Sequence, residues 1–192
     1  MTGAGARPTV AGALLRGYIS VLERRGLLPE VRALVSEGTR EIIDHPPFPI
    51  SWVETLVMEE MMDALGRLRG REVVKDVALE TARTKAGPIV IPFMRTLLGL
   101  WGATPESLFK HVHRLAGVHA KGLNVTYVPE TPSSGAVEFV YPYAPGDYVY
   151  ASWEGAYHLA FEVCGVKGTI GRAEMSDGGR RARIRVRWEA GR

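Results

Sequence analysis

Apolar residues recur at helical spacing through the first two-thirds of this chain. Between residues 10 and 119 they fall three and four positions apart, which places one apolar stripe along each helix. Helices cannot continue across the run Pro46-Pro47-Phe48-Pro49. The pattern predicts five or six helices, at Val10–Arg25, Pro29–Asp44, Ser51–Arg69, Glu72–Lys85, Ile89–Trp101 and Thr104–His119.

Two of these predicted helices carry a start signal. Ser51 and Glu54 have the spacing of a capping box, in which each side chain satisfies a free amide at the helix start. Thr104 followed by Pro105 fits an N-cap with proline at the first helical position.

After Gly122 the apolar period changes from helical spacing to alternation, which is typical of strands. Ser176-Asp177-Gly178-Gly179 is a strong hairpin turn, because glycine supplies positive φ angles. Strands are predicted at Leu123–Val128, Ala136–Tyr141, Val166–Met175 and Ala182–Trp188.

Between the two strand pairs lies one more predicted helix, Ser152–Cys164, with Ser152 as N-cap and Gly165 just past its end. The order predicts an α+β fold, in which a helical N-terminal half packs on a four-stranded antiparallel sheet ordered strand-strand-helix-strand-strand. We expect a flexible terminus over residues 1–9 and a single domain over 10–192, with the helical part at 10–120 and the sheet part at 122–190.

Composition is that of an ordinary globular protein, with 46% hydrophobic and 23% charged residues and a net charge of +3. The single cysteine, Cys164, excludes an internal disulfide and favours a cytoplasmic location. The most apolar run, Ile89–Trp101, is shorter than the ~20 residues of a membrane span. Phosphate-binding loops, zinc-protease motifs and paired C-x-x-C motifs are absent from the sequence, so we expect a non-catalytic protein without a cofactor.

Apolar helix surface exceeds what one thin layer can bury. It predicts either a homodimer seam or a cavity for an apolar ligand, with a protein partner as a further option, although ordinary core packing explains the surplus as well. Cys164 lies on this surface as a small hydrophobe rather than as a reactive thiol. The predicted pocket residues are Met61, Phe93, Leu97, Trp101, Trp153, Tyr157, Phe161 and Cys164.

Two polar patterns offer alternatives. Glu154, His158 and Glu162 are four apart and could hold a metal, although a solvated helix face explains them as well. The last strand carries arginines on its solvent side, where they guard an edge or bind an anion; without an aromatic among them, nucleic acid is disfavoured. These arginines are Arg181, Arg183, Arg185 and Arg187.

The element order resembles the superfamily of Bet3-like trafficking subunits, 4-vinyl-reductase-type domains and heme-nitric-oxide-binding domains. More closely, the chain resembles a myxobacterial family of paralogues of about this length and unassigned function. The resemblance rests on Leu15-Arg16-Gly17, on Phe109–Leu115, and on the tail from Gly165-Val166-Lys167-Gly168 to Val186-Arg187-Trp188.

The heme-binding branch implies a histidine ligand followed by Y-x-S-x-R, whose arginine pairs with the heme propionates. Tyr150 and Ser152 match this motif, whereas Glu154 replaces the arginine and would repel propionates. His111 and His113 precede the motif at a suitable distance, and His158 follows it.

The leading hypothesis is therefore a non-catalytic sensory or scaffold domain that dimerises through its N-terminal helices and encloses an apolar ligand between helices and sheet. A heme- or metal-dependent sensor is the second hypothesis. Anion or nucleic-acid binding through the arginine strand is the third.

Overall fold

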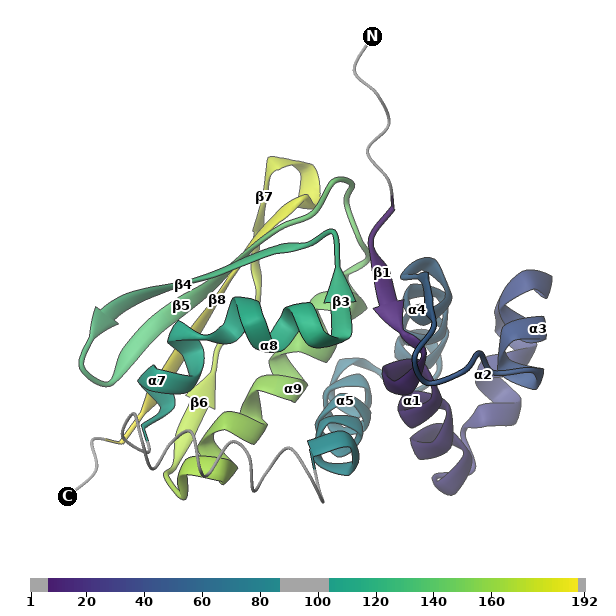
Figure 1. The fold of residues 1–192 in the computed structure, drawn as a ribbon, viewed down its shortest axis with the longest axis horizontal. Helices are drawn as coiled ribbons and strands as arrows, with labels where there is room; N and C mark the ends of the chain where they lie inside the picture. Colours follow the sequence, from purple (N-terminus) through teal and green to yellow (C-terminus); the bar gives the residue numbers. More distant parts are fainter. Residues whose placement is uncertain (1–6, 87–103, 190–192) are drawn as a thin grey trace, which may run out of the picture.

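The computed structural model describes residues 7–86 and 104–189, and these form an α+β fold as predicted. Figure 1 shows the helices of residues 12–86 on one side of the molecule and the main sheet on the other, with α8 (Val112–His119) and α9 (Asp147–Cys164) between them. The predicted helix Ile89–Trp101 lies outside the described residues.

The helical half contains α1 (Gly12–Arg24), α2 (Leu28–Leu34), α3 (Glu37–Asp44), α4 (Leu56–Arg69) and α5 (Arg71–Ala86). The single helix predicted over Pro29–Asp44 is wrong, because the chain is extended at Val35 and restarts at Ser36. The Ser36 side chain accepts from the Thr39 amide at 3.4 Å and so caps α3.

A small sheet joins three segments that are far apart in the sequence: β1 (Thr9–Ala11), β2 (Trp52–Glu54) and β3 (Ala120–Lys121), in the order β2-β1-β3. The predicted capping box at Ser51–Glu54 is therefore wrong. Trp52 and Val53 pair with β1 instead, so α4 begins only after Thr55. Three-residue strands are too short to leave an alternating pattern.

The main sheet contains β4 (Asn124–Thr131), β5 (Ser134–Val140), β6 (Gly168–Ile170), β7 (Glu174–Ser176) and β8 (Arg181–Trp188). Its antiparallel order is β4-β5-β8-β6, and β7 also pairs with β8. The strand predicted over Val166–Met175 is thus two strands. Between them the amide of Ala173 donates to the Glu154 carboxylate at 2.7 Å instead of joining the ladder.

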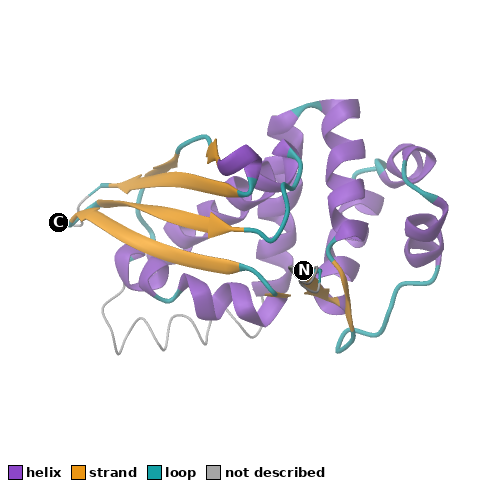
Figure 2. Cartoon of the chain, turned by 90° about the horizontal axis from the view of Figure 1, so that it is seen from above, coloured by secondary structure: helices purple, strands orange, loops and turns teal. Residues whose placement is uncertain are grey.

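Helix α9 (Asp147–Cys164) packs against this sheet, and Figure 2 shows the helices of residues 12–86 stacked to the side of it. The helix begins five residues before the predicted Ser152, with Gly146 as N-cap. Gly165 does end it in the left-handed conformation, at φ 67°. The sequence did not indicate this earlier start, because the aromatic and β-branched residues Tyr148-Val149-Tyr150 are more typical of strands.

Helices α5 and α9 pack backbone to backbone. A Cβ added at Gly155 of α9 would lie 2.1 Å from the carbonyl oxygen of Lys75 in α5, so only glycine permits this approach. The hydrophobic core is continuous across the two halves, from Leu15 and Leu65 in the helices to Phe139 and Ile184 in the sheet.

The helix predicted over Thr104–His119 is two helices, α7 (Pro105–Lys110) and α8 (Val112–His119), which break at His111. Thr104 caps α7 as expected, because its hydroxyl accepts from the Ser107 amide at 3.3 Å. Phe109 of α7 then stacks on Tyr127 of β4 and Trp188 of β8.

Within residues 7–86 and 104–189, the helices are too short or too polar to cross a bilayer.

Candidate functional site

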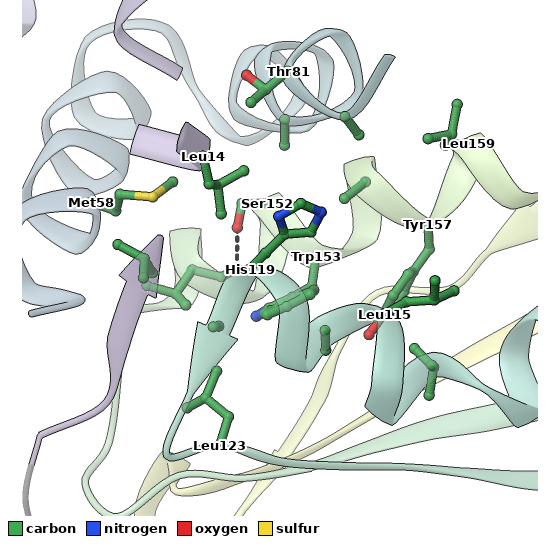
Figure 3. A pocket seen from close by; sticks show the side chains of 18 of the residues that line it. Leu14, Met58, Thr81, Leu115, His119, Leu123, Ser152, Trp153, Tyr157 and Leu159 are labelled. Atoms are coloured by element: carbon green, nitrogen blue, oxygen red, sulfur yellow. Dashed lines mark hydrogen bonds between the residues drawn. The ribbon is translucent and has the colours of Figure 1, made fainter. Parts of the chain in front are cut away.

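A cavity of about 400 Å³ lies where the two halves of the chain meet. Its walls come from α1, α4 and α5 on one side and from α8 and α9 on the other. Figure 3 shows Leu14 and Met58 facing Leu115 and Leu159 across this space. The volume falls within the range of roughly 300–1,000 Å³ that is usual for small-molecule sites.

Most polar groups in the wall already have partners. The Trp153 indole N–H donates to the Tyr141 hydroxyl at 2.8 Å, and the Thr81 hydroxyl donates to the Val77 carbonyl at 2.8 Å. The Ser152 hydroxyl donates to the Val149 carbonyl at 2.7 Å. These groups are therefore satisfied by the fold itself.

Among the described residues, two tyrosines in the wall have hydroxyls without a hydrogen-bond partner. Tyr18 of α1 and Tyr157 of α9 are 1% and 8% exposed, and their hydroxyls have no hydrogen-bond partner within the described part of the chain. Burial raises the pKa of both phenols well above the ordinary value, so both stay protonated. A buried polar group without a partner costs about 1–3 kcal/mol, so these hydroxyls weaken the fold; both oxygen atoms are buried and do not open into the cavity.

A carboxylate also reaches the wall. Glu59 of α4 lines the cavity and accepts a hydrogen bond from the Tyr143 hydroxyl, which lies 2.8 Å from the Thr55 hydroxyl. Burial and this carboxylate raise the pKa of Tyr143, so the phenol remains the donor.

His119, the last residue of α8, lines the cavity, whereas His111 and His113 are not among the residues that line it. Figure 3 shows the His119 imidazole standing between α8 and α9, close to Ser152 and Trp153. The sequence contained a signal for this position. His119 lies three residues after Ala116 and seven after Val112, both buried, and therefore shares their helix face.

In the stretch that matches Y-x-S-x-R, the polar side chains bond to groups of the protein itself. The Tyr150 hydroxyl donates to the Gly179 carbonyl at 2.7 Å, and Ser152 is bonded within its own helix. Glu154 is only 2% exposed and forms an ion pair with Arg71 at the start of α5. The solvated face expected for Glu154 is therefore wrong, and its carboxylate bridges α9, α5 and the amide of Ala173.

His158 and Glu162, the other residues of the predicted polar stripe, are less buried than Glu154. Glu162 pairs with Arg83 of α5, and both side chains are well exposed. His158 is partly buried, and burial followed by the charge of Lys75 lowers its pKa. Among the described residues, no group of three His, Cys, Asp or Glu side chains could hold a metal ion.

The predicted pocket residues divide between cavity and core. Trp153 and Tyr157 line the cavity. Met61 and Phe161 are buried in the main core, and Cys164 packs beside Leu108. Burial raises the pKa of the Cys164 thiol to about 11, in keeping with an unreactive cysteine. Phe93, Leu97 and Trp101 lie outside the described residues.

The arginines of β8 face away from the core, as their alternation predicted. Arg183 pairs with Glu130 and Glu138 at 2.8 and 2.6 Å. Arg185 pairs with Glu174 and Arg181 with Asp177, at 2.5 and 3.8 Å. Arg187 borders a polar depression together with Arg172 and Glu174. These carboxylates neutralise much of the charge that an anion would need.

Comparison with solved structures identifies the fold. An H-NOX protein mutant from K. algicida, solved as unliganded Fe(II), superposes with a TM-score of 0.68 at 12% identity, covering 94% of this chain and 97% of that one. An oxygen-binding H-NOX domain related to soluble guanylate cyclases gives 0.60 at 12% identity, over 94% and 95%. A structure described under the modulation of heme redox potential by porphyrin distortion gives 0.60 at 12%, over 95% and 96%.

The chain therefore has the fold of the heme-nitric-oxide-binding domains, which the sequence resemblance included. No protein-family model matches the chain, and no curated protein matches its sequence. The myxobacterial family and the Bet3-like branch thus gain no support from these comparisons.

Proposed function

We propose that this chain is a sensor domain whose signal is the binding of a small molecule in the cavity between its helical half and α8–α9. The observation that carries the proposal is the cavity of about 400 Å³, walled by both halves of the chain. Because both halves contribute walls, occupancy changes the contacts that hold them together, and a ligand that binds only one arrangement shifts the population towards it.

The shared fold favours a heme-dependent sensor over a scaffold that binds nothing. The heme-dependent sensor is supported by His119, which lines the cavity, since imidazole is a common ligand of heme iron. A bound heme would supply an iron that can bind a diatomic gas. In such a complex, His119 would hold the iron and the apolar walls would exclude water.

The lining fits the iron of a heme better than its propionates. Among the described residues that line the cavity there is no lysine or arginine, and the one charged side chain is the carboxylate of Glu59. Glu154, where the motif has arginine, is turned towards Arg71. A heme would therefore leave two carboxylates without the cationic partners that such groups require.

Hemin titration tests the heme candidate. If heme is the ligand, one equivalent binds per chain with a shifted Soret band, and His119→Ala abolishes the shift. His113→Ala is the matched control, because His113 is exposed on the same helix and does not line the cavity. A shift that His119→Ala leaves unchanged would exclude this histidine as the ligand.

Uptake of N-phenylnaphthylamine tests the broader proposal. This neutral dye becomes fluorescent in apolar surroundings, and we expect saturable binding of one molecule per chain. Linear, non-saturating fluorescence would contradict an internal site.

Dimerisation through the helical half remains a prediction. Met61 is completely buried in the core, so Met61→Asp would unfold the protein rather than separate two chains. Static light scattering on the unaltered protein is the appropriate check, and a monomer at high concentration would contradict the prediction.

A further inference from the structure

One face of α4 lines the cavity and carries an acidic side chain. The residues that α4 and the position just before it contribute to the lining are Thr55, Met58, Glu59 and Met62. They are three and four positions apart and therefore share one face of the helix. Glu59 thus leaves the helix on the side of the cavity, between two methionines that also line it.

The Glu59 carboxylate lies close to aromatic side chains. It accepts a hydrogen bond from the Tyr143 hydroxyl, and the Tyr143 ring packs edge to face on that of Tyr141, with centroids 6.1 Å apart. Tyr141 itself lines the cavity. Burial is the main cause that raises the pKa of Tyr141, and the charge of Glu59 contributes to the rise, as expected for neighbouring groups.

The charge of Glu59 lacks a cationic partner. Glu154 of α9 is paired with Arg71, whereas Glu59 has no ion-pair partner among the residues that the structure describes. Its one hydrogen-bond donor there is the phenol of Tyr143, which is neutral. A partly buried carboxylate without a counter-charge is unfavourable, so a bound cation would stabilise it.

The remainder of the lining restricts the ligand further. Lysine and arginine are absent from the described residues that line the cavity, so an organic anion would meet Glu59 and no counter-charge. Figure 3 shows apolar side chains such as Leu14, Met58 and Leu115 around the rest of the space. An apolar body that ends in a cation satisfies both parts of the lining.

We propose that the cavity takes an organic amine, with its protonated nitrogen at Glu59 and its apolar body among the leucine and methionine side chains. The inference rests on the proposed function, since it names the ligand class of the same cavity. A carboxylate accepts several hydrogen bonds, so Glu59 can bind an ammonium group while Tyr143 still donates to it. The nearby ring of Tyr141 adds an attraction for a cation.

Three molecules with the same eight-carbon chain separate charge from apolar size. Near neutral pH, octylamine is a cation, 1-octanol is neutral and octanoate is an anion. Each is titrated against N-phenylnaphthylamine bound to the unaltered protein. We expect octylamine to displace the dye at a concentration about tenfold lower than octanol does, the effect of one hydrogen bond to a charged group, and octanoate to be the weakest competitor.

Glu59→Gln keeps the shape of the side chain and removes its charge. Octylamine should lose its tenfold advantage in this variant, while octanol stays within about twofold of its value in the unaltered protein. Glu60→Gln is the matched control, because it removes the same charge from the next residue, which accepts from Ser36 and does not line the cavity. The preference for octylamine should persist there. Thermal unfolding of both variants shows whether they are folded.

The ligand series on the unaltered protein decides the question independently of the variants. Equal competition by octylamine and octanol would overturn the inference, as would octanoate as the strongest competitor or a preference that Glu59→Gln leaves intact. Saturable dye binding in any of these cases would leave the proposed function standing. Hemin that binds through His119 while octylamine fails to compete would also overturn the inference and leave a sensor. Failure of the dye and of hemin to bind at all would instead remove the proposed function.

Discussion

Glu154 occupies a position that the sequence associates with ligand binding, but its side chain stabilises the fold. Its place in the Y-x-S-x-R pattern points to a cofactor, and its helix spacing points to solvent. The structure instead buries the carboxylate against Arg71, which is 15% exposed, and the Ala173 amide. The sequence could not reveal this role, because the partner lies 83 residues earlier.

Of the ion pairs that join α5 to α9, the buried pair of Glu154 with Arg71 and the exposed pair of Glu162 with Arg83 allow a matched comparison. Glu154→Ala leaves the Arg71 guanidinium partly buried with only Asp147 as partner, so we expect a loss of about 3 kcal/mol in the free energy of unfolding. Glu162→Ala breaks the exposed pair with Arg83 and should cost below about 1 kcal/mol. Urea denaturation measures both, and equal losses would mean that Glu154 is not a buried anchor.

At the scale of elements, the contact between α5 and α9 determines where the cavity lies. The two helices touch at Gly155, and ion pairs join them on either side of this contact. Both helices also contribute residues to the cavity wall. A separation at Gly155 would therefore change the cavity directly.

Gly155→Ala tests this close approach. The new methyl group would collide with the Lys75 carbonyl, and we expect a destabilisation of about 2 kcal/mol despite the better helix propensity of alanine. Gly117→Ala in α8 is the control. A Cβ there meets nothing within 4 Å, so stability should rise by about 0.5–1 kcal/mol. A neutral Gly155→Ala, as judged by thermal unfolding, would show that α5 and α9 are not in backbone contact.

At the scale of the whole molecule, local signals predicted much of the fold. Alternation along β8, the cap at Thr104 and the glycine after α9 are all read from neighbouring residues, and the structure confirms each of them. The small sheet β2-β1-β3 was missed, because its strands have two or three residues and pair across long stretches of sequence.

The candidate site was predictable only in part. Trp153 and Tyr157 followed from the apolar face of their helix, and His119 could have followed from the face of Val112 and Ala116. The unpartnered state of Tyr18 and Tyr157 could not, because it depends on what every surrounding element fails to offer.

The central claim is that the cavity between the two halves holds a small molecule. The most direct test is titration of N-phenylnaphthylamine into the unaltered protein and into Ala156→Phe, in which a ring from α9 fills the space. We predict saturable binding of one dye per chain that Ala156→Phe abolishes, while the variant unfolds at a similar urea concentration. Equal dye binding by both proteins would place the dye elsewhere and contradict the claim.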